Sequence, residues 1–164
     1  NPKYKVIVWE MFLKFVDFWE TYKPVLIETE VHLFSDKWEI AGTCDLVCEI
    51  EINGVKEIWI IDFKTSNHLF DVYDLQLACY KTCYEECFGV EINKTGVLWL
   101  KSKSRGEDKN NKIIKGKGWE IYESSRSYKK NMELFRYTKS LFDLTNPKHK
   151  PFQTSFPVNI KRNF

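Results

Sequence analysis

The sequence lacks a long hydrophobic run, an excess of charge of one sign and the paired cysteines of a metal-binding motif. No apolar stretch approaches the ~20 residues needed to cross a bilayer, so we expect no membrane contact. Glu10 and Lys14 interrupt the first apolar residues, which argues against a secretory leader. The net charge is only +2, so a nucleic-acid signal has to come from local clustering.

Five cysteines are present, but none forms a Cys-x-x-Cys pair. Cys79, Cys83 and Cys87 recur every four residues, which places them on one face of a predicted helix. This spacing fits a closed zinc site poorly, and no pair of histidines completes one. We therefore expect buried thiols in a reducing compartment, which predicts a cytoplasmic protein.

The length of 164 residues suits one domain with a full hydrophobic core. Apolar residues make up 43% and aromatic residues 16%, which excludes a disordered chain. We find no repeat, low-complexity tract or linker, so residues 1–164 are predicted to form a single domain. The first residue is Asn rather than Met, which leaves open that the chain is a fragment lacking upstream helices.

Hydrophobic periodicity predicts an α/β fold. Apolar residues at helical spacing predict helices, and strict alternation predicts strands. The predicted helices are residues 6–22, 71–88 and 125–145, and the predicted strands are 25–34, 38–52, 55–64, 95–101 and 119–123. Asp71 is expected to cap the start of the second helix and Gly89 its end, while residues 102–118 are expected to form a mobile loop. This order predicts a mixed central sheet flanked by helices.

The strongest hairpin signal is Asn53–Gly54, which makes the second and third predicted strands antiparallel neighbours. Symmetric pairing about this turn sets Asp45 against Asp62. Two unpaired carboxylates side by side repel each other and raise each other's pKa. A divalent cation between them removes this conflict, and oxygen ligands suit Mg²⁺ or Mn²⁺.

Other polar side chains are expected around this pair. Strand alternation places Lys64 on the same face as Asp62, where an ammonium can orient a water molecule or stabilise charge on a phosphorane. Glu30, on the preceding strand, is a candidate third ligand, although a solvated strand residue is an equal alternative. Gln76 and Tyr80 share one face of the next helix, where they can hold a phosphate and line the entrance.

A basic segment follows the predicted strand 95–101. Between Lys101 and Gly118 there are seven basic and two acidic residues, which suits a phosphate backbone. A solvated surface explains such a charge run equally well. The residues expected to contact nucleic acid are Lys101, Lys103 and Arg105 of this segment, with Tyr80, Thr65, Ser66 and His68 near Asp62.

Three motifs together resemble the PD-(D/E)XK nuclease superfamily, especially its RecB-like and phage exonuclease branch. They are "GTCD" at residues 42–45, "IIDFKTS" at 60–66 and "DLQLACY" at 74–80. Each motif alone is common, but their order and their placement on strands and a helix form a specific signal. The resemblance covers roughly residues 10–100 and implies a restriction-endonuclease-like core with the order α-β-β-β-α-β.

The resemblance implies roles for individual residues. Asp45, Asp62 and the backbone carbonyl of Phe63 would bind Mg²⁺ or Mn²⁺, Lys64 would be catalytic, and Gln76 would support it. Glu30 matches the glutamate that this branch carries on a strand. The cysteines of the iron–sulfur subgroup are missing, so we expect no iron–sulfur cluster.

One departure concerns the upstream metal ligand. Many RecB-like enzymes carry a metal-binding histidine on an upstream helix, whereas no histidine precedes His32 here. Either Glu20 substitutes for it, or the segment that carries the ligand lies outside this chain.

The expected function is that of a Mg²⁺-dependent deoxyribonuclease. The resemblance favours an exonuclease of DNA recombination, repair or phage DNA processing, acting on single strands or duplex ends. Such an enzyme would work in the cytoplasm, or in the host cytoplasm if phage-encoded, as a homo-oligomer or in a larger recombination or replication complex. The alternative is an inactive nuclease-like module that binds nucleic acid or a protein.

Overall fold

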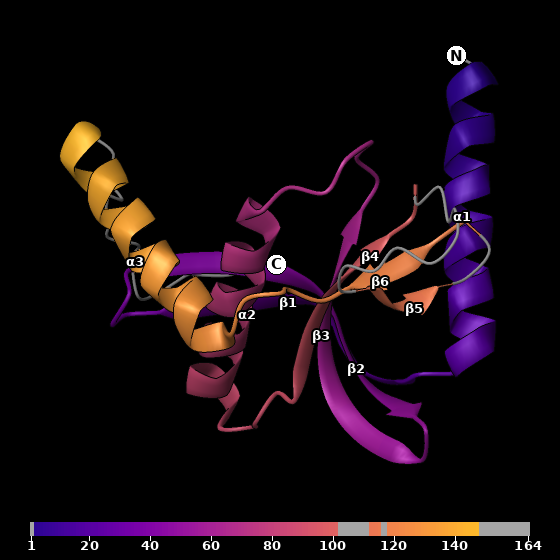
Figure 1. Ribbon diagram of the computed structural model, residues 1–164, viewed down its shortest axis with the longest axis horizontal. Helices are drawn as coiled ribbons and strands as arrows, with labels where there is room; N and C mark the ends of the chain where they lie inside the picture. The colour runs from indigo at the N-terminus through magenta and orange to yellow at the C-terminus, as the bar shows by residue number, and fades with distance from the viewer. Residues whose placement is uncertain (1, 102–111, 116–117, 148–164) are drawn as a thin grey trace, which may run out of the picture.

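The computed structural model describes residues 2–101, 112–115 and 118–147, which form three helices and one six-stranded sheet (Figure 1). The helices are α1 (Pro2–Tyr22), α2 (Val72–Phe88) and α3 (Tyr128–Thr145). The strands are β1 (Val25–Ser35), β2 (Ile40–Ile52), β3 (Val55–Lys64), β4 (Lys94–Trp99), β5 (Lys112–Lys115) and β6 (Glu120–Tyr122). The α/β class is confirmed, and none of the described helices has the length and hydrophobicity to span a membrane.

The sheet is mixed, with the strand order β1-β2-β3-β4-β6-β5. β3 and β4 are parallel and are joined through α2, whereas the other neighbouring strands are antiparallel. β5 lies inside residues 102–118, where we predicted a loop, and that prediction was wrong for these four residues. A strand of this length has too few alternating positions to stand out from a basic, polar surrounding.

The Asn53–Gly54 turn fixes the register of β2 and β3. Asn53 has a φ of 53° and Gly54 a φ of 79°, the left-handed pair that a type I′ turn requires. The strands pair from Ile52↔Val55 to Leu46↔Ile61, which is the symmetric register predicted from the sequence. The turn therefore carries the ends of both strands, with Asp45 and Asp62, to the same part of the sheet.

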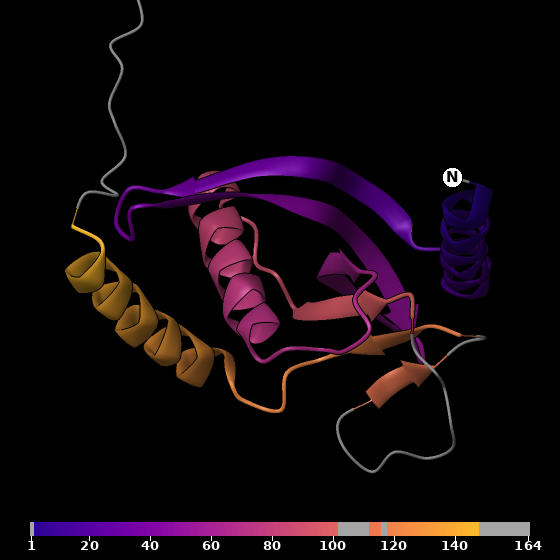
Figure 2. The same cartoon turned by 90° about the horizontal axis from the view of Figure 1, so that it is seen from above.

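Each face of the sheet has its own hydrophobic core. On one face, the α1 side, Phe18 is fully buried and packs with Leu46, Ile61 and Trp119. On the other, the α2 side, Leu77 packs with residues that include Val31, Ile60 and Val97. Figure 2 shows α2 lying within the concave curve of β1 and β2. The helices thus cover opposite faces, and the alternation along β3 decides which residues face α2.

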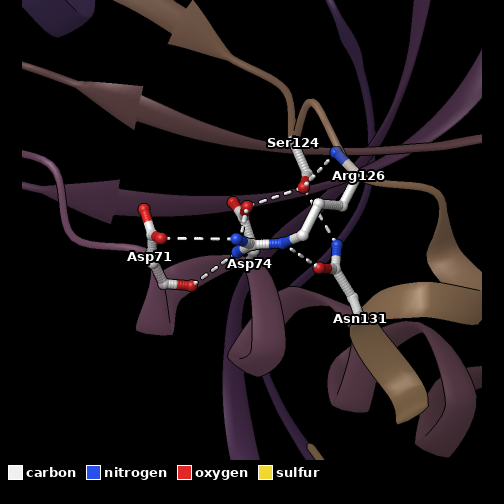
Figure 3. A network of polar contacts seen from close by, with 5 residues as sticks. All are labelled: Asp71, Asp74, Ser124, Arg126 and Asn131. Atoms are coloured by element: carbon white, nitrogen blue, oxygen red, sulfur yellow. Dashed lines mark hydrogen bonds and ion pairs between the residues drawn. The ribbon is translucent and has the colours of Figure 1, made fainter. Parts of the chain in front are cut away.

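α3 packs on α2 and is anchored by a polar cluster around Arg126 (Figure 3). The Arg126 guanidinium donates to Asp74 Oδ2 at 2.9 Å and to Asn131 Oδ1 at 2.8 Å. Ser124 Oγ donates to the same Asp74 oxygen at 2.6 Å. Asp71 precedes α2 as predicted, but its side chain caps no helical N–H and instead accepts from Arg126 at 3.3 Å. The predicted C-cap at Gly89 is confirmed.

Candidate active site

The end of β3 buries an acid beside a lysine. Asp62 is 2% exposed, and its Oδ2 forms an ion pair with Lys64 Nζ. Both side chains point to the α2 side, because the intervening Phe63 and the preceding Ile61 pack on the α1 side. The apolar strand residues before Asp62 are fully buried, so the strand presents this carboxylate from a rigid support.

Asp45 lies where the β2–β3 ladder ends. The last paired residues are Leu46 and Ile61, and one position further Asp45 Oδ2 accepts a hydrogen bond from the Phe63 backbone N–H at 2.7 Å. The carboxylate thus replaces a backbone acceptor and is held beside Asp62. The ring of Phe63 packs on the opposite side, 5.5 Å from that of Phe15 between centroids.

The charge of Asp45 acts on Asp62, in agreement with the register predicted from the sequence. Burial raises the pKa of the Asp62 carboxyl, Lys64 opposes this shift through its hydrogen bond and charge, and the charge of Asp45 raises the pKa further. Lys64 thus supplies a positive charge that favours the ionised form of this carboxyl.

β1 and β2 change faces together at Glu30 and Asp45. Strict alternation predicts that Cys44 and Leu46 share a face, yet Cys44 packs in the α2-side core and Leu46 in the α1-side core. Glu30, whose neighbours in β1 pair with these two residues, has a φ of 52°, in the left-handed region that few non-glycine residues adopt. Glu30 therefore lies opposite Asp45 between these two pairs, and the Glu30 residue is exposed.

Gln76 and Tyr80 form the α2 wall of the site. Gln76 Nε2 donates to the Tyr80 hydroxyl at 2.7 Å, as expected for residues one helical turn apart. Burial raises the pKa of Tyr80, the Gln76 hydrogen bond lowers it, and the charges of Asp62 and Asp45 raise it. Both aspartates therefore act on the hydroxyl, which places Tyr80 at the same site.

Gly42 of the "GTCD" motif makes room for Tyr80. A Cβ atom at this position would lie 2.8 Å from Tyr80 Cε1.

We predict that Gly42→Ala lowers the free energy of unfolding by about 1–3 kcal/mol, because the Tyr80 ring must shift in a packed site. Urea denaturation of Gly42→Ala in the wild-type and Tyr80→Ala backgrounds measures this, and an equal loss in both backgrounds would contradict the steric cause.

The loop after β3 is held by hydrogen bonds. Ser66 Oγ donates to the His68 carbonyl at 2.6 Å, and Trp99 Nε1 of β4 donates to the Ser66 carbonyl at 2.7 Å. Thr65 and His68 are exposed, so they are accessible to a ligand. Lys101 Nζ reaches Asn67 Oδ1 in this loop at 3.2 Å. The other two predicted basic contacts, Lys103 and Arg105, lie outside the described residues.

Glu20, the other acidic ligand predicted from the sequence, does not lie near the aspartates. Glu20 is exposed on α1, which covers the opposite face of the sheet from Asp62. Among the residues that the structure describes, no three His, Cys, Asp or Glu side chains form a metal-binding group. The chemistry of Asp45 and Asp62 nevertheless fits a hard divalent cation, because both offer carboxylate oxygens and their mutual repulsion raises the pKa of Asp62.

Tyr73 and Trp99 belong to the site but were missed from the sequence. The Lys64 ammonium lies 4.8 Å from the centroid of the Tyr73 ring. Tyr73 precedes Tyr80 by seven residues, so the helical period alone places both on one face of α2. No sequence pattern indicates Trp99. Its place beside the loop after β3 depends on the parallel pairing of Lys64 with Trp99 across β3 and β4.

All five cysteines are free, as expected, and three of them, Cys44, Cys48 and Cys83, are buried. Burial raises the pKa of the Cys44 and Cys48 thiols to about 12. These thiols therefore remain protonated near neutral pH and do not act as nucleophiles.

Comparison with known proteins yields neither a matching family model nor a matching curated sequence. What the chain does has to be inferred from the geometry of Asp45, Asp62, Lys64 and the α2 wall.

Proposed function

We propose that the chain is a metal-dependent nuclease of the PD-(D/E)XK type that hydrolyses DNA phosphodiester bonds. The main support is the buried Asp62 carboxylate at the end of β3, with Lys64 paired to it and Asp45 acting on it. Burying charged side chains costs free energy, because they lose their contact with water. Charged groups that are nevertheless buried together are typical of catalytic sites. The element order α1-β1-β2-β3-α2-β4 agrees with a restriction-endonuclease-like core, which is part of this proposal.

Each side chain has a role in this proposal. Asp45 and Asp62 would hold one or two Mg²⁺ or Mn²⁺ ions, which when bound supply positive charge to a phosphate oxygen and lower the pKa of water. The Lys64 ammonium stabilises negative charge that develops on the phosphate. Gln76 and Tyr80, joined by their hydrogen bond, line the α2 side and orient the phosphate group.

The finer function follows the resemblance in the sequence. We infer an exonuclease that acts on DNA ends in recombination, repair or phage DNA processing, in the cytoplasm, as a homo-oligomer or within a larger complex. Lys101 contacts the loop after β3 and so brings a basic side chain near the end of the strand that carries Asp62. Its position supports the proposal that the phosphate backbone of DNA binds along this loop.

A second candidate is a nuclease-like module that binds nucleic acid or a protein without cutting. Two observations favour it. Lys64 already neutralises Asp62, and no third acidic ligand joins the aspartates in the described part of the chain. In this case the buried ion pair would be a structural element of the strand end.

Digestion of DNA separates these candidates. We expect an end-labelled linear duplex to be degraded with Mg²⁺ or Mn²⁺, and the rate to fall by about a hundredfold or more with a chelator. A covalently closed circle should survive, because an exonuclease needs an end. Cleavage of the circle would refute a strict exonuclease. Absence of cleavage with either metal would favour the binding module, and cleavage that resists the chelator would contradict metal dependence.

A further inference from the structure

Lys64 lies between two groups that attract its charge. Its Nζ forms the ion pair with Asp62 Oδ2, and on another side the Tyr73 ring centroid lies 4.8 Å away. The negative face of an aromatic ring attracts an ammonium ion, and it does so more strongly where water is largely excluded. The Lys64 side chain is 20% exposed, so both interactions are only partly screened.

The Tyr73 ring is itself fixed in place. Its hydroxyl donates to Ser66 Oγ at 3.4 Å, and the Ser66 carbonyl accepts the Trp99 indole N–H at 2.7 Å. The Phe70 ring packs edge-on against Tyr73, with the centroids 5.7 Å apart. These contacts hold the ring beside Lys64, where it offers the ammonium a second partner next to Asp62.

A cation that binds Asp62 is repelled by the Lys64 ammonium. Asp62 is 2% exposed, and Lys64 contacts one of its two carboxylate oxygens. Two positive charges on one small carboxylate repel each other strongly in a partly buried site. A divalent ion at Asp62 therefore weakens the Lys64–Asp62 pair, while the contact of Lys64 with Tyr73 does not depend on that carboxylate.

We propose that Lys64 competes with a divalent cation for Asp62 and that Tyr73 is the positioning residue that holds Lys64 once the carboxylate is engaged. Lys64 thereby sets the metal affinity of the site as well as acting on the phosphate. This inference rests on the proposed function, because it assumes a metal at Asp62. It adds a regulation of that site: the lysine keeps the carboxylate neutralised until a divalent cation displaces it.

Calorimetric titration with Mn²⁺ tests the competition without any measurement of activity. We expect Lys64→Met to bind Mn²⁺ about tenfold more tightly than the wild type, because the competing charge is gone. Tyr73→Leu should bind about three- to tenfold more weakly, since the ammonium then has only Asp62 as a partner, whereas Tyr73→Phe should match the wild type because it keeps the ring. Thermal unfolding of each variant verifies that it is folded.

The matched control is Lys81→Met. Lys81 has the same two kinds of partner, a carboxylate of Glu85 at 2.9 Å and the ring of Tyr128 at 5.4 Å, but on a different face of α2. Its replacement should leave the Mn²⁺ affinity unchanged. Equal or weaker binding by Lys64→Met relative to the wild type overturns the competition and leaves the proposed function standing. No binding by the wild type and by Lys64→Met overturns the proposed function itself.

Discussion

Replacement of Arg126 by alanine is expected to lower the free energy of unfolding by about 3–5 kcal/mol. The loss arises because Asp74 is 2% exposed and would remain buried without its main cationic partner. The same substitution removes the contacts of the guanidinium with Asn131 and Asp71 (Figure 3). These contacts join α3 to the start of α2, so the tertiary packing of α3 should weaken with them.

Urea denaturation followed by circular dichroism measures this loss. The matched control is Lys130→Ala, which removes an exposed ion pair with Glu133 on α3 and should leave the free energy of unfolding nearly unchanged. Asp74→Asn combined with Arg126→Met should recover part of the loss, because no unpaired charge then stays buried. A loss below about 1 kcal/mol in Arg126→Ala would show that the cluster does not anchor α3.

Replacement of Asp62 by asparagine is expected to reduce DNA cleavage about a thousandfold or more, which corresponds to about 4 kcal/mol of transition-state stabilisation. The amide has nearly the shape of the carboxylate but lacks the charge that holds a cation.

Lys64→Ala is expected to reduce cleavage by about a hundredfold or more, because positive charge near the phosphate is lost. Asp62→Asn should remain folded, since Lys64 is partly exposed and keeps the Tyr73 ring beside it. Lys64→Ala leaves the buried Asp62 without its cationic partner and should lose stability, so circular dichroism has to show that it is folded before rates are compared.

Initial rates on an end-labelled duplex under Mg²⁺ provide the comparison. Glu57→Gln is the matched control, because it removes an acid from the same strand at the opposite end of β3, and it should cleave like the wild type. Cleavage by Asp62→Asn and Lys64→Ala at the rate of an active wild type would refute the assignment of the site.

Much of the fold and the central pair of carboxylates could be predicted because local rules determine them. The Asn53–Gly54 turn allows one register, and that register alone places Asp45 beside Asp62. The helical period likewise places Gln76 and Tyr80 on one face, and the structure joins them by a hydrogen bond.

The features that escaped prediction depend on tertiary contacts. β2 changes faces between Cys44 and Leu46, beside Glu30 with its left-handed φ, and no local pattern signals such a conformation for glutamate. Asp71 had the right position for a helix cap, but Arg126, distant in the sequence, draws its side chain away. Glu20 was proposed from its place in the sequence, whereas the face that α1 covers depends on its aromatic packing.

Calorimetric titration of the wild type and Asp62→Asn with Mn²⁺ tests the central claim, a metal held by these carboxylates, most directly. We predict that the wild type binds Mn²⁺ at millimolar concentration or below and that Asp62→Asn loses most of this binding while remaining folded. Equal binding by both proteins, or no binding by the wild type at millimolar Mn²⁺, would contradict a metal centre at the end of β3.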